Sequence, residues 1–142
     1  GLILPGGEST VQLKLINEGG LFESISEFVF SKKPLLATCA GLILCAANVI
    51  NPSQESFGWI NISIKRNAYG SQLESFEAIS DIYKYHLIFI RAPQIIEASN
   101  PVQVIDTYKN QPILVRQDNV WGTTFHPELS PDLNLYKLIF KK

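Results

Sequence analysis

The sequence predicts an α/β fold in which a parallel sheet is extended by antiparallel strands in its second half. In the first half, apolar strand patterns alternate with helical patterns, and this order favours a parallel sheet with right-handed crossovers. In the second half, short apolar runs follow one another, and two of them flank a Lys-Asn turn, which favours a hairpin. By its length, the chain of 142 residues is expected to form a single domain, residues 1–142.

The first half of the chain contains two expected strands and three expected helices. Pro5-Gly6-Gly7 ends the first strand, and Ser9 or Thr10 then supplies an N-cap for the first helix. Gly19-Gly20 ends that helix. The expected strands cover residues 1–4 and 34–38, and the expected helices cover residues 11–18, 21–30 and 40 to about 48.

The second half is expected to consist of strands followed by one helix. Residues 59–64 alternate between apolar and polar side chains, the pattern of a half-exposed strand. Pro131-Asp132 opens a terminal helix with an apolar side. The further expected strands cover residues 87–91, 102–105, 112–115 and 120–125, with the hairpin turn at Lys109-Asn110.

Composition excludes several classes of protein. Hydrophobic residues make up 46% and charged residues 18% of the chain, which is typical of a compact domain and not of a disordered one. The net charge of −1 and the scattered basic residues give no nucleic-acid footprint, and no apolar run is long enough for a membrane span. The two cysteines lie in one strand–helix unit, which favours a reducing cytoplasm over a disulfide framework. Because Gly1 already lies inside a strand, we expect the chain to lack the beginning of its domain.

Cys39 lies where an apolar strand leads directly into a helix. Such an elbow presents the nucleophile of many hydrolases on a tight turn, so we expect this thiol to face solvent or ligand. The N–H groups and dipole of the following helix favour the thiolate. Cys39 is therefore a candidate nucleophile, whereas Cys45 falls inside the expected helix and is interpreted as core packing.

A cysteine nucleophile needs a base and a group that orients the base. His126 precedes Pro127 in an extended segment, where residues two apart point the same way, so Glu128 is placed to accept a hydrogen bond from the His126 ring. A solvated His-Pro-Glu turn remains the alternative. The other histidine, His86, is interpreted as a surface or strand-edge residue.

The Pro5-Gly6-Gly7 turn exposes backbone N–H groups between a strand and a helix. Its glycines permit peptide rotations that other residues resist. An ordinary turn is the alternative interpretation. Together with the N–H of Ala40, the turn offers donors for an oxyanion hole.

Together these segments resemble class I glutamine amidotransferases, whose signature is a Cys-His-Glu triad in that chain order. The resemblance covers nearly the whole chain and is closer still to the glutaminase subunits of pyridoxal 5′-phosphate synthases. It implies a flavodoxin-like fold whose N-terminal strands are absent from this chain. The matching segments are residues 4–10 (LPGGEST), 38–42 (TCAGL), 66–71 (RNAYGS), 89–93 (FIRAP) and 125–129 (FHPEL).

The resemblance assigns a role to each matching residue. It implies that Cys39 attacks the side-chain amide of glutamine, that His126 transfers the proton and that Glu128 orients His126. Gly7 and Ala40 would supply the oxyanion donors. The implied glutamine-binding residues are Gly7, Glu8, Ser9, Arg66, Ile90 and Arg91.

The implied reaction is the hydrolysis of L-glutamine to glutamate and ammonia. The resemblance further implies that a barrel-type synthase subunit receives the ammonia for vitamin B6 biosynthesis, and that no cofactor or metal takes part. Two alternatives remain. One is a class I glutaminase serving another acceptor, which the Arg-Asn-Ala-Tyr-Gly run argues against; the other is a truncated, non-catalytic fragment that binds a partner.

Overall fold

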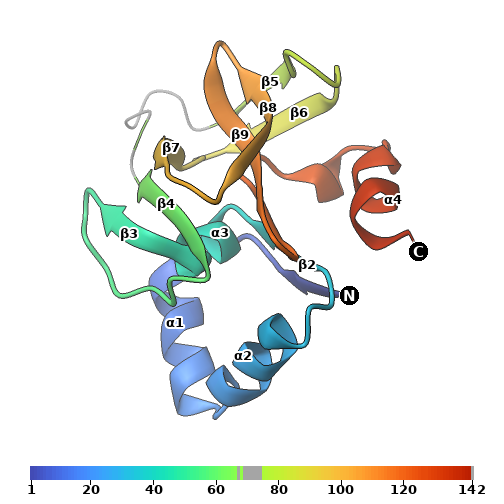
Figure 1. The fold of residues 1–142 in the computed structure, drawn as a ribbon. Helices are drawn as coiled ribbons and strands as arrows, with labels where there is room; N and C mark the ends of the chain where they lie inside the picture. Colours follow the sequence, from blue (N-terminus) through green and yellow to red (C-terminus); the bar gives the residue numbers. More distant parts are fainter. Residues whose placement is uncertain (67, 69–74, 142) are drawn as a thin grey trace.

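A five-stranded mixed sheet organises the molecule (Figure 1). The computed structural model describes residues 1–66, 68 and 75–141. The first three strands of the sheet run parallel, and the last two are added antiparallel as a hairpin. This confirms the predicted α/β class and the antiparallel additions. In spatial order the strands are β1 (Leu2–Leu4), β2 (Leu35–Thr38), β10 (Val120–Thr123), β9 (Gln111–Gln117) and β8 (Gln103–Tyr108).

Strand β2 is buried on both of its faces. Leu35 and Ala37 belong to one hydrophobic cluster, and Leu36, which points the other way, belongs to a second. A strand covered on both sides is mainly apolar, because both sets of alternating side chains lie in a core. This explains why residues 34–37 form a continuous apolar run in the sequence.

Helices pack against both faces of β2. Helix α2 (Phe22–Phe30) contributes Val29 to the cluster that contains Leu35, and helix α4 (Asn134–Phe140) contributes Leu135 to the cluster that contains Leu36. Among the described residues, no helix is long and apolar enough to cross a membrane. The other helices are α1 (Ser9–Glu18), α3 (Ala40–Cys45) and the single 3₁₀ turn η1 (Pro127–Leu129).

Two smaller sheets flank the central one (Figure 1). In the first, β3 pairs parallel with β4, and β4 pairs antiparallel with β7. In the second, β5 and β6 form an antiparallel pair. Their bounds are β3 (Ala46–Ile50), β4 (Ile60–Lys65), β7 (Gln94–Ala98), β5 (Ser75–Ile79) and β6 (His86–Ile90).

The structure corrects two local predictions in the first half of the chain. The helix expected to reach about residue 48 ends at Cys45, because the residues that follow join the β3–β4 ladder. The N-cap of α1 is Glu8 and not Ser9 or Thr10: its carboxylate accepts a hydrogen bond from the N–H of Val11. An N-cap side chain accepts hydrogen bonds from the unpaired N–H groups in the first turn of a helix. A carboxylate can do this as well as a hydroxyl, so Glu8 can cap α1 in place of Ser9 or Thr10.

Candidate active site

Three neighbouring parallel strands end at the same edge of the central sheet. In register, Leu4 of β1 lies beside Ala37 of β2, and Thr38 of β2 lies beside Thr123 of β10. The segments that follow these strands therefore meet at one edge, where open α/β sheets bind their ligands. These segments carry the predicted Gly6-Gly7 turn, Cys39 and His126.

Cys39 occupies a sharp turn between β2 and α3. Its backbone angles of φ 49° and ψ −103° lie outside the usual regions for a residue with a side chain. The turn is held on both sides, because the N–H of Cys39 donates to Thr123 O at 2.9 Å and its carbonyl accepts from Ile43 N at 3.1 Å. A Cβ on Gly41 would lie 2.2 Å from the Leu4 carbonyl oxygen, so only glycine permits this approach of α3 to β1. The structure thus confirms the predicted elbow.

The environment of the Cys39 thiol differs from the expectation in one respect. Only 7% of the residue is exposed, so it is buried and does not face open solvent. Burial raises the pKa of Cys39 to about 11, although a hydrogen bond from the Ala40 N–H opposes the shift; the Glu128 carboxylate adds to it. The predicted preference for thiolate is therefore wrong for the free protein, because desolvation outweighs the helix N-terminus. The sulfur is a neutral thiol at neutral pH and requires a base.

His126 is already paired with Glu128. The distance from His126 Nδ1 to Glu128 Oε1 is 2.6 Å, and 11% of the His126 side chain is exposed. The backbone differs from the extended segment predicted, because η1 begins directly after His126; the predicted contact nevertheless forms. When Nδ1–H donates to the carboxylate, Nε2 is left as a proton acceptor. The His126 N–H donates to Ile88 O at 2.8 Å, which ties this segment to β6.

The glycine turn after β1 lies against His126. A Cβ on Gly6 would lie 2.5 Å from Cε1 of the imidazole, and Gly7 has a φ of 137°, which side chains disfavour. The amide of Gln12, one turn into α1, donates to the carbonyl oxygens of Pro5 at 3.1 Å and Gly6 at 3.0 Å. The contact of Gln12 is not apparent from the sequence, because it depends on how α1 packs over the turn.

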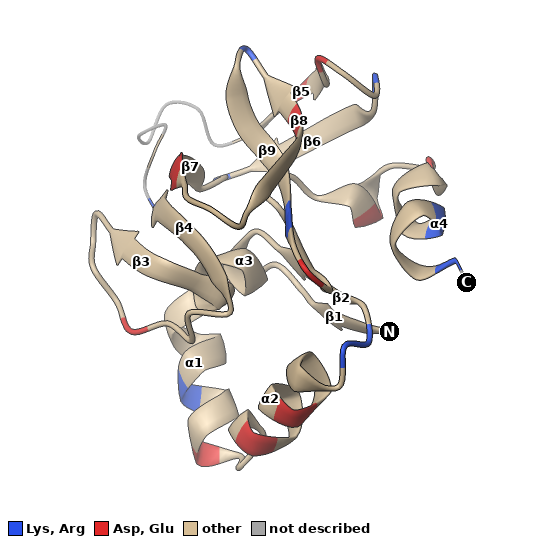
Figure 2. Cartoon of the chain, viewed as in Figure 1, with Lys and Arg blue, Asp and Glu red and all other residues tan. Residues whose placement is uncertain are grey.

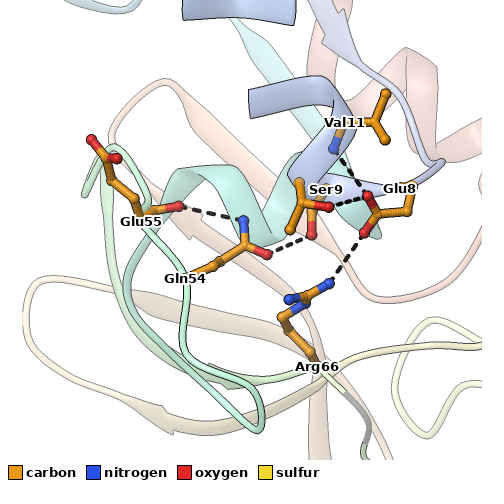
Figure 3. Close-up of polar contacts among 7 residues, drawn as sticks. Glu8, Ser9, Val11, Gln54, Glu55 and Arg66 are labelled. Carbon is orange, nitrogen blue, oxygen red and sulfur yellow. Dashed lines mark hydrogen bonds and ion pairs between the residues drawn. The ribbon is translucent and has the colours of Figure 1, made fainter. Parts of the chain in front are cut away.

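Glu8, Ser9 and Arg66 form a polar group beside this turn (Figure 3). Glu8 Oε1 accepts from the Arg66 guanidinium at 3.1 Å, and Oε2 accepts from the Thr10 hydroxyl, which is the main reason why the pKa of Glu8 is lowered. Ser9 donates to the side chain of Gln54 at 2.7 Å. Three of the predicted glutamine-binding residues therefore lie together. Gln54 belongs to the same polar group, although it was not predicted from the sequence.

The remaining predicted glutamine-binding residues lie in one segment, at the end of β6. Ile90 is the last residue of β6, and Arg91 directly after it has a φ of 44°, a second strained position near the predicted site. Of the run 66–71, positions 67 and 69–71 lie outside the described residues.

His86 begins β6 and pairs with Glu77 at 2.7 Å, in keeping with its interpretation as a strand-edge residue. Cys45 is fully buried in the core, as predicted.

Comparison with known proteins shows which family this chain belongs to. The model of the SNO glutamine amidotransferase family matches residues 1–142. The chain belongs to this family. Among its relatives, the protein named pyridoxal 5′-phosphate synthase subunit PdxT of Thermotoga maritima is 44% identical over 142 aligned residues, covering 96% of this chain and 76% of the relative. The protein of the same name from Kosmotoga olearia is 43% identical, covering 100% of this chain and 77% of the relative.

The fold agrees with membership of the SNO family. A crystal structure of a glutamine amidotransferase matches with a TM-score of 0.90 and 36% sequence identity, over 98% of this chain and 76% of that one. This confirms the expected class I amidotransferase fold. In this SNO-family chain, the edge that carries the elbow cysteine also carries the histidine–glutamate pair.

Proposed function

We propose that this chain hydrolyses L-glutamine with a Cys39-His126-Glu128 triad. The observation that supports this most is the hydrogen bond of 2.6 Å between His126 and Glu128, at the end of the strand beside the Cys39 elbow. A carboxylate fixes the tautomer of a catalytic histidine in this way, and leaves its second nitrogen free to accept the proton of the nucleophile.

The buried thiol defines the first step of the reaction. Burial raises the pKa of Cys39 to about 11, so a base must remove the thiol proton for the sulfur to attack. His126 Nε2 accepts the thiol proton while Sγ forms a bond to the amide carbon of glutamine. The carbonyl oxygen becomes an oxyanion, and the N–H groups of Gly7 and Ala40 are the donors proposed to stabilise it.

Collapse of the tetrahedral intermediate releases ammonia and forms a glutamyl thioester. His126 returns its proton to the leaving nitrogen, and the carbon–nitrogen bond breaks. Water then attacks the thioester, with His126 again as base, and glutamate leaves as the thiol is restored. Glu128 stabilises the imidazolium that forms in both halves of the reaction.

The polar group around Glu8 is suited to the charged end of the substrate. Arg66 uses one guanidinium nitrogen for Glu8, and its remaining N–H groups can bind an α-carboxylate. We assign the binding of glutamine to this group together with Gly7 of the glycine turn and two residues at the end of β6. The proposed binding residues are Gly7, Glu8, Ser9, Arg66, Ile90 and Arg91.

We further propose that the ammonia passes to a barrel-type pyridoxal 5′-phosphate synthase subunit. The support is the printed name of the relatives, which describes them as a subunit of that synthase. A cytoplasmic location is part of the proposal, because both cysteines are free thiols.

Replacement of the nucleophile tests the proposed function. We expect Cys39→Ala to reduce ammonia release from glutamine to background in the presence of saturating synthase, while the affinity for the synthase stays within about twofold, because the buried Cys39 side chain exposes little surface to a partner. Ammonia release would be followed in a coupled assay, and binding by sedimentation.

The matched control is Cys45→Ala, which removes the other thiol from the same strand–helix unit. This variant is expected to keep near wild-type turnover, because Cys45 lies wholly in the core. Wild-type turnover in Cys39→Ala would contradict the assigned nucleophile. A wild-type chain that releases no ammonia with or without the synthase would contradict the proposed function.

A further inference from the structure

We infer that Thr123 is a positioning residue whose hydroxyl group sets the place of His126 relative to Cys39. The inference rests on the proposed glutaminase function. Thr123 is the last residue of β10 and is fully buried. Its backbone carbonyl accepts a hydrogen bond from the Cys39 N–H at 2.9 Å. Its hydroxyl group donates to the carbonyl oxygen of Phe125, the residue before His126, at 3.1 Å.

The first of these contacts joins the nucleophile to β10. In register, Thr123 lies beside Thr38, the residue that precedes Cys39, and the Cys39 N–H continues the parallel ladder by one residue. The contact uses only backbone atoms. It is therefore kept whatever side chain stands at position 123, so a substitution there changes the second contact alone.

The second contact holds the peptide group that joins Phe125 to His126. This group is planar, and its carbonyl and N–H point in opposite directions. The Thr123 hydroxyl holds the carbonyl at 3.1 Å, and the carbonyl oxygen of Ile88 accepts from the N–H at 2.8 Å. Because hydrogen bonds hold the group at both ends, it resists rotation, and the Cα of His126 keeps its place and direction.

The hydrogen bond to Glu128 does not replace this anchor. It orients the His126 ring through Nδ1, at 2.6 Å, but Glu128 lies two residues further along the same segment and moves with it. Proton transfer from a buried thiol needs the base within hydrogen-bond reach of the proton. A misplacement of about 1 Å can lower the rate about 100-fold. Since Ile88 still holds the N–H when the hydroxyl is absent, we expect a smaller displacement and a smaller loss.

Two pairs of proteins isolate the hydroxyl group in the complex with saturating synthase. Wild type and Thr123→Val differ by a hydroxyl exchanged for a methyl group, whereas Thr123→Ser and Thr123→Ala differ by the hydroxyl alone. Within each pair, we expect the member without the hydroxyl to have a kcat about 10-fold lower, with the KM for glutamine within about twofold. The kcat is referred to folded complex isolated by gel filtration.

Thr107→Val is the matched control, because it makes the same exchange in β8, the outer strand of the central sheet. It removes a hydroxyl that donates to Asp81 at 2.7 Å. We expect this variant to leave both kcat and KM unchanged, since neither residue contacts the segments that carry Cys39 and His126.

Equal kcat values within either pair would overturn the inference, as would a raised KM with unchanged kcat. Failure of both hydroxyl-free variants to fold would also overturn it, because the hydroxyl would then support the fold as a whole. If the wild-type complex is itself inactive, the proposed function fails instead, so the two failures are distinguishable.

Discussion

The chemistry of this site depends on the state of one sulfur atom. Cys39 lies on a strained elbow with 7% of its surface exposed, and burial holds it as a neutral thiol. The same burial removes water from the reacting atoms, which strengthens each electrostatic contact there. In the proposed mechanism, the His126–Glu128 pair supplies the base that a neutral thiol needs.

The pH dependence of alkylation tests the state of Cys39. With a pKa of about 11, the thiolate fraction at pH 8 is about 10⁻³, and the rate of reaction with iodoacetamide is expected to rise about tenfold per pH unit from pH 8 to pH 10. The measurement uses the free chain with the Cys45→Ala substitution, and urea-unfolded chain as control, whose rate should level off near pH 9.

The same shift has a consequence for stability. Because the pKa of Cys39 in the folded chain lies above its ordinary value of 9.0, its contribution to stability is complete below about pH 9 and is lost as the pH rises through about 11. An alkylation rate that already levels off below pH 8 in the folded chain would contradict the neutral thiol.

At the scale of elements, the position of the elbow depends on the contact between α3 and β1. Gly41 is the closest point of this contact, and a Cβ there would lie 2.2 Å from the oxygen and 2.8 Å from the carbon of the Leu4 carbonyl group. Both atoms belong to the backbone, so the clash is relieved only when α3 moves away from β1. A displaced α3 also displaces Cys39, which precedes it.

Gly41→Ala is therefore expected to lower the free energy of unfolding by about 2–3 kcal/mol, measured by urea denaturation. The control is Gly20→Asn, because nothing lies within 4 Å of a Cβ at this position and asparagine tolerates its φ of +65°. Equal stability of the two variants would show that α3 does not approach β1 this closely.

Sequence patterns predicted most elements, and the failures have a local cause. The apolar run at 34–37 is short and continuous, which is typical of a doubly buried strand, and β2 forms there. By contrast, the apolar run 40–47 continues from α3 into β3, and its division after Cys45 is decided by pairing with β4. Strand β7 was missed for a similar reason: its register is set by β4.

At the scale of the whole molecule, the sheet topology brings the site together. Parallel pairing of β1, β2 and β10 places their ends at one edge, although the third strand lies far along the chain. Figure 2 shows that charged residues of both signs are spread along the described part of the chain, on helices, strands and loops.

The parts of the candidate site that are formed by short sequence motifs could be predicted. The elbow at Cys39 and the His126–Glu128 contact follow from local sequence, and both are present. The burial of the thiol and the Gln12 contact could not be predicted in this way, because they depend on how α1, α3 and the turn after β1 pack together.

Labelling by a glutamine analogue tests the assigned nucleophile most directly. A diazoketone analogue of glutamine alkylates the thiol that attacks it, with loss of nitrogen, and leaves a stable thioether that peptide mass spectrometry can locate. In the complex with the synthase, we expect one label per chain, on Cys39, formed in step with the loss of glutaminase activity and prevented by excess glutamine. Full loss of activity with the label on another residue, while Cys39 remains unmodified, would contradict this mechanism.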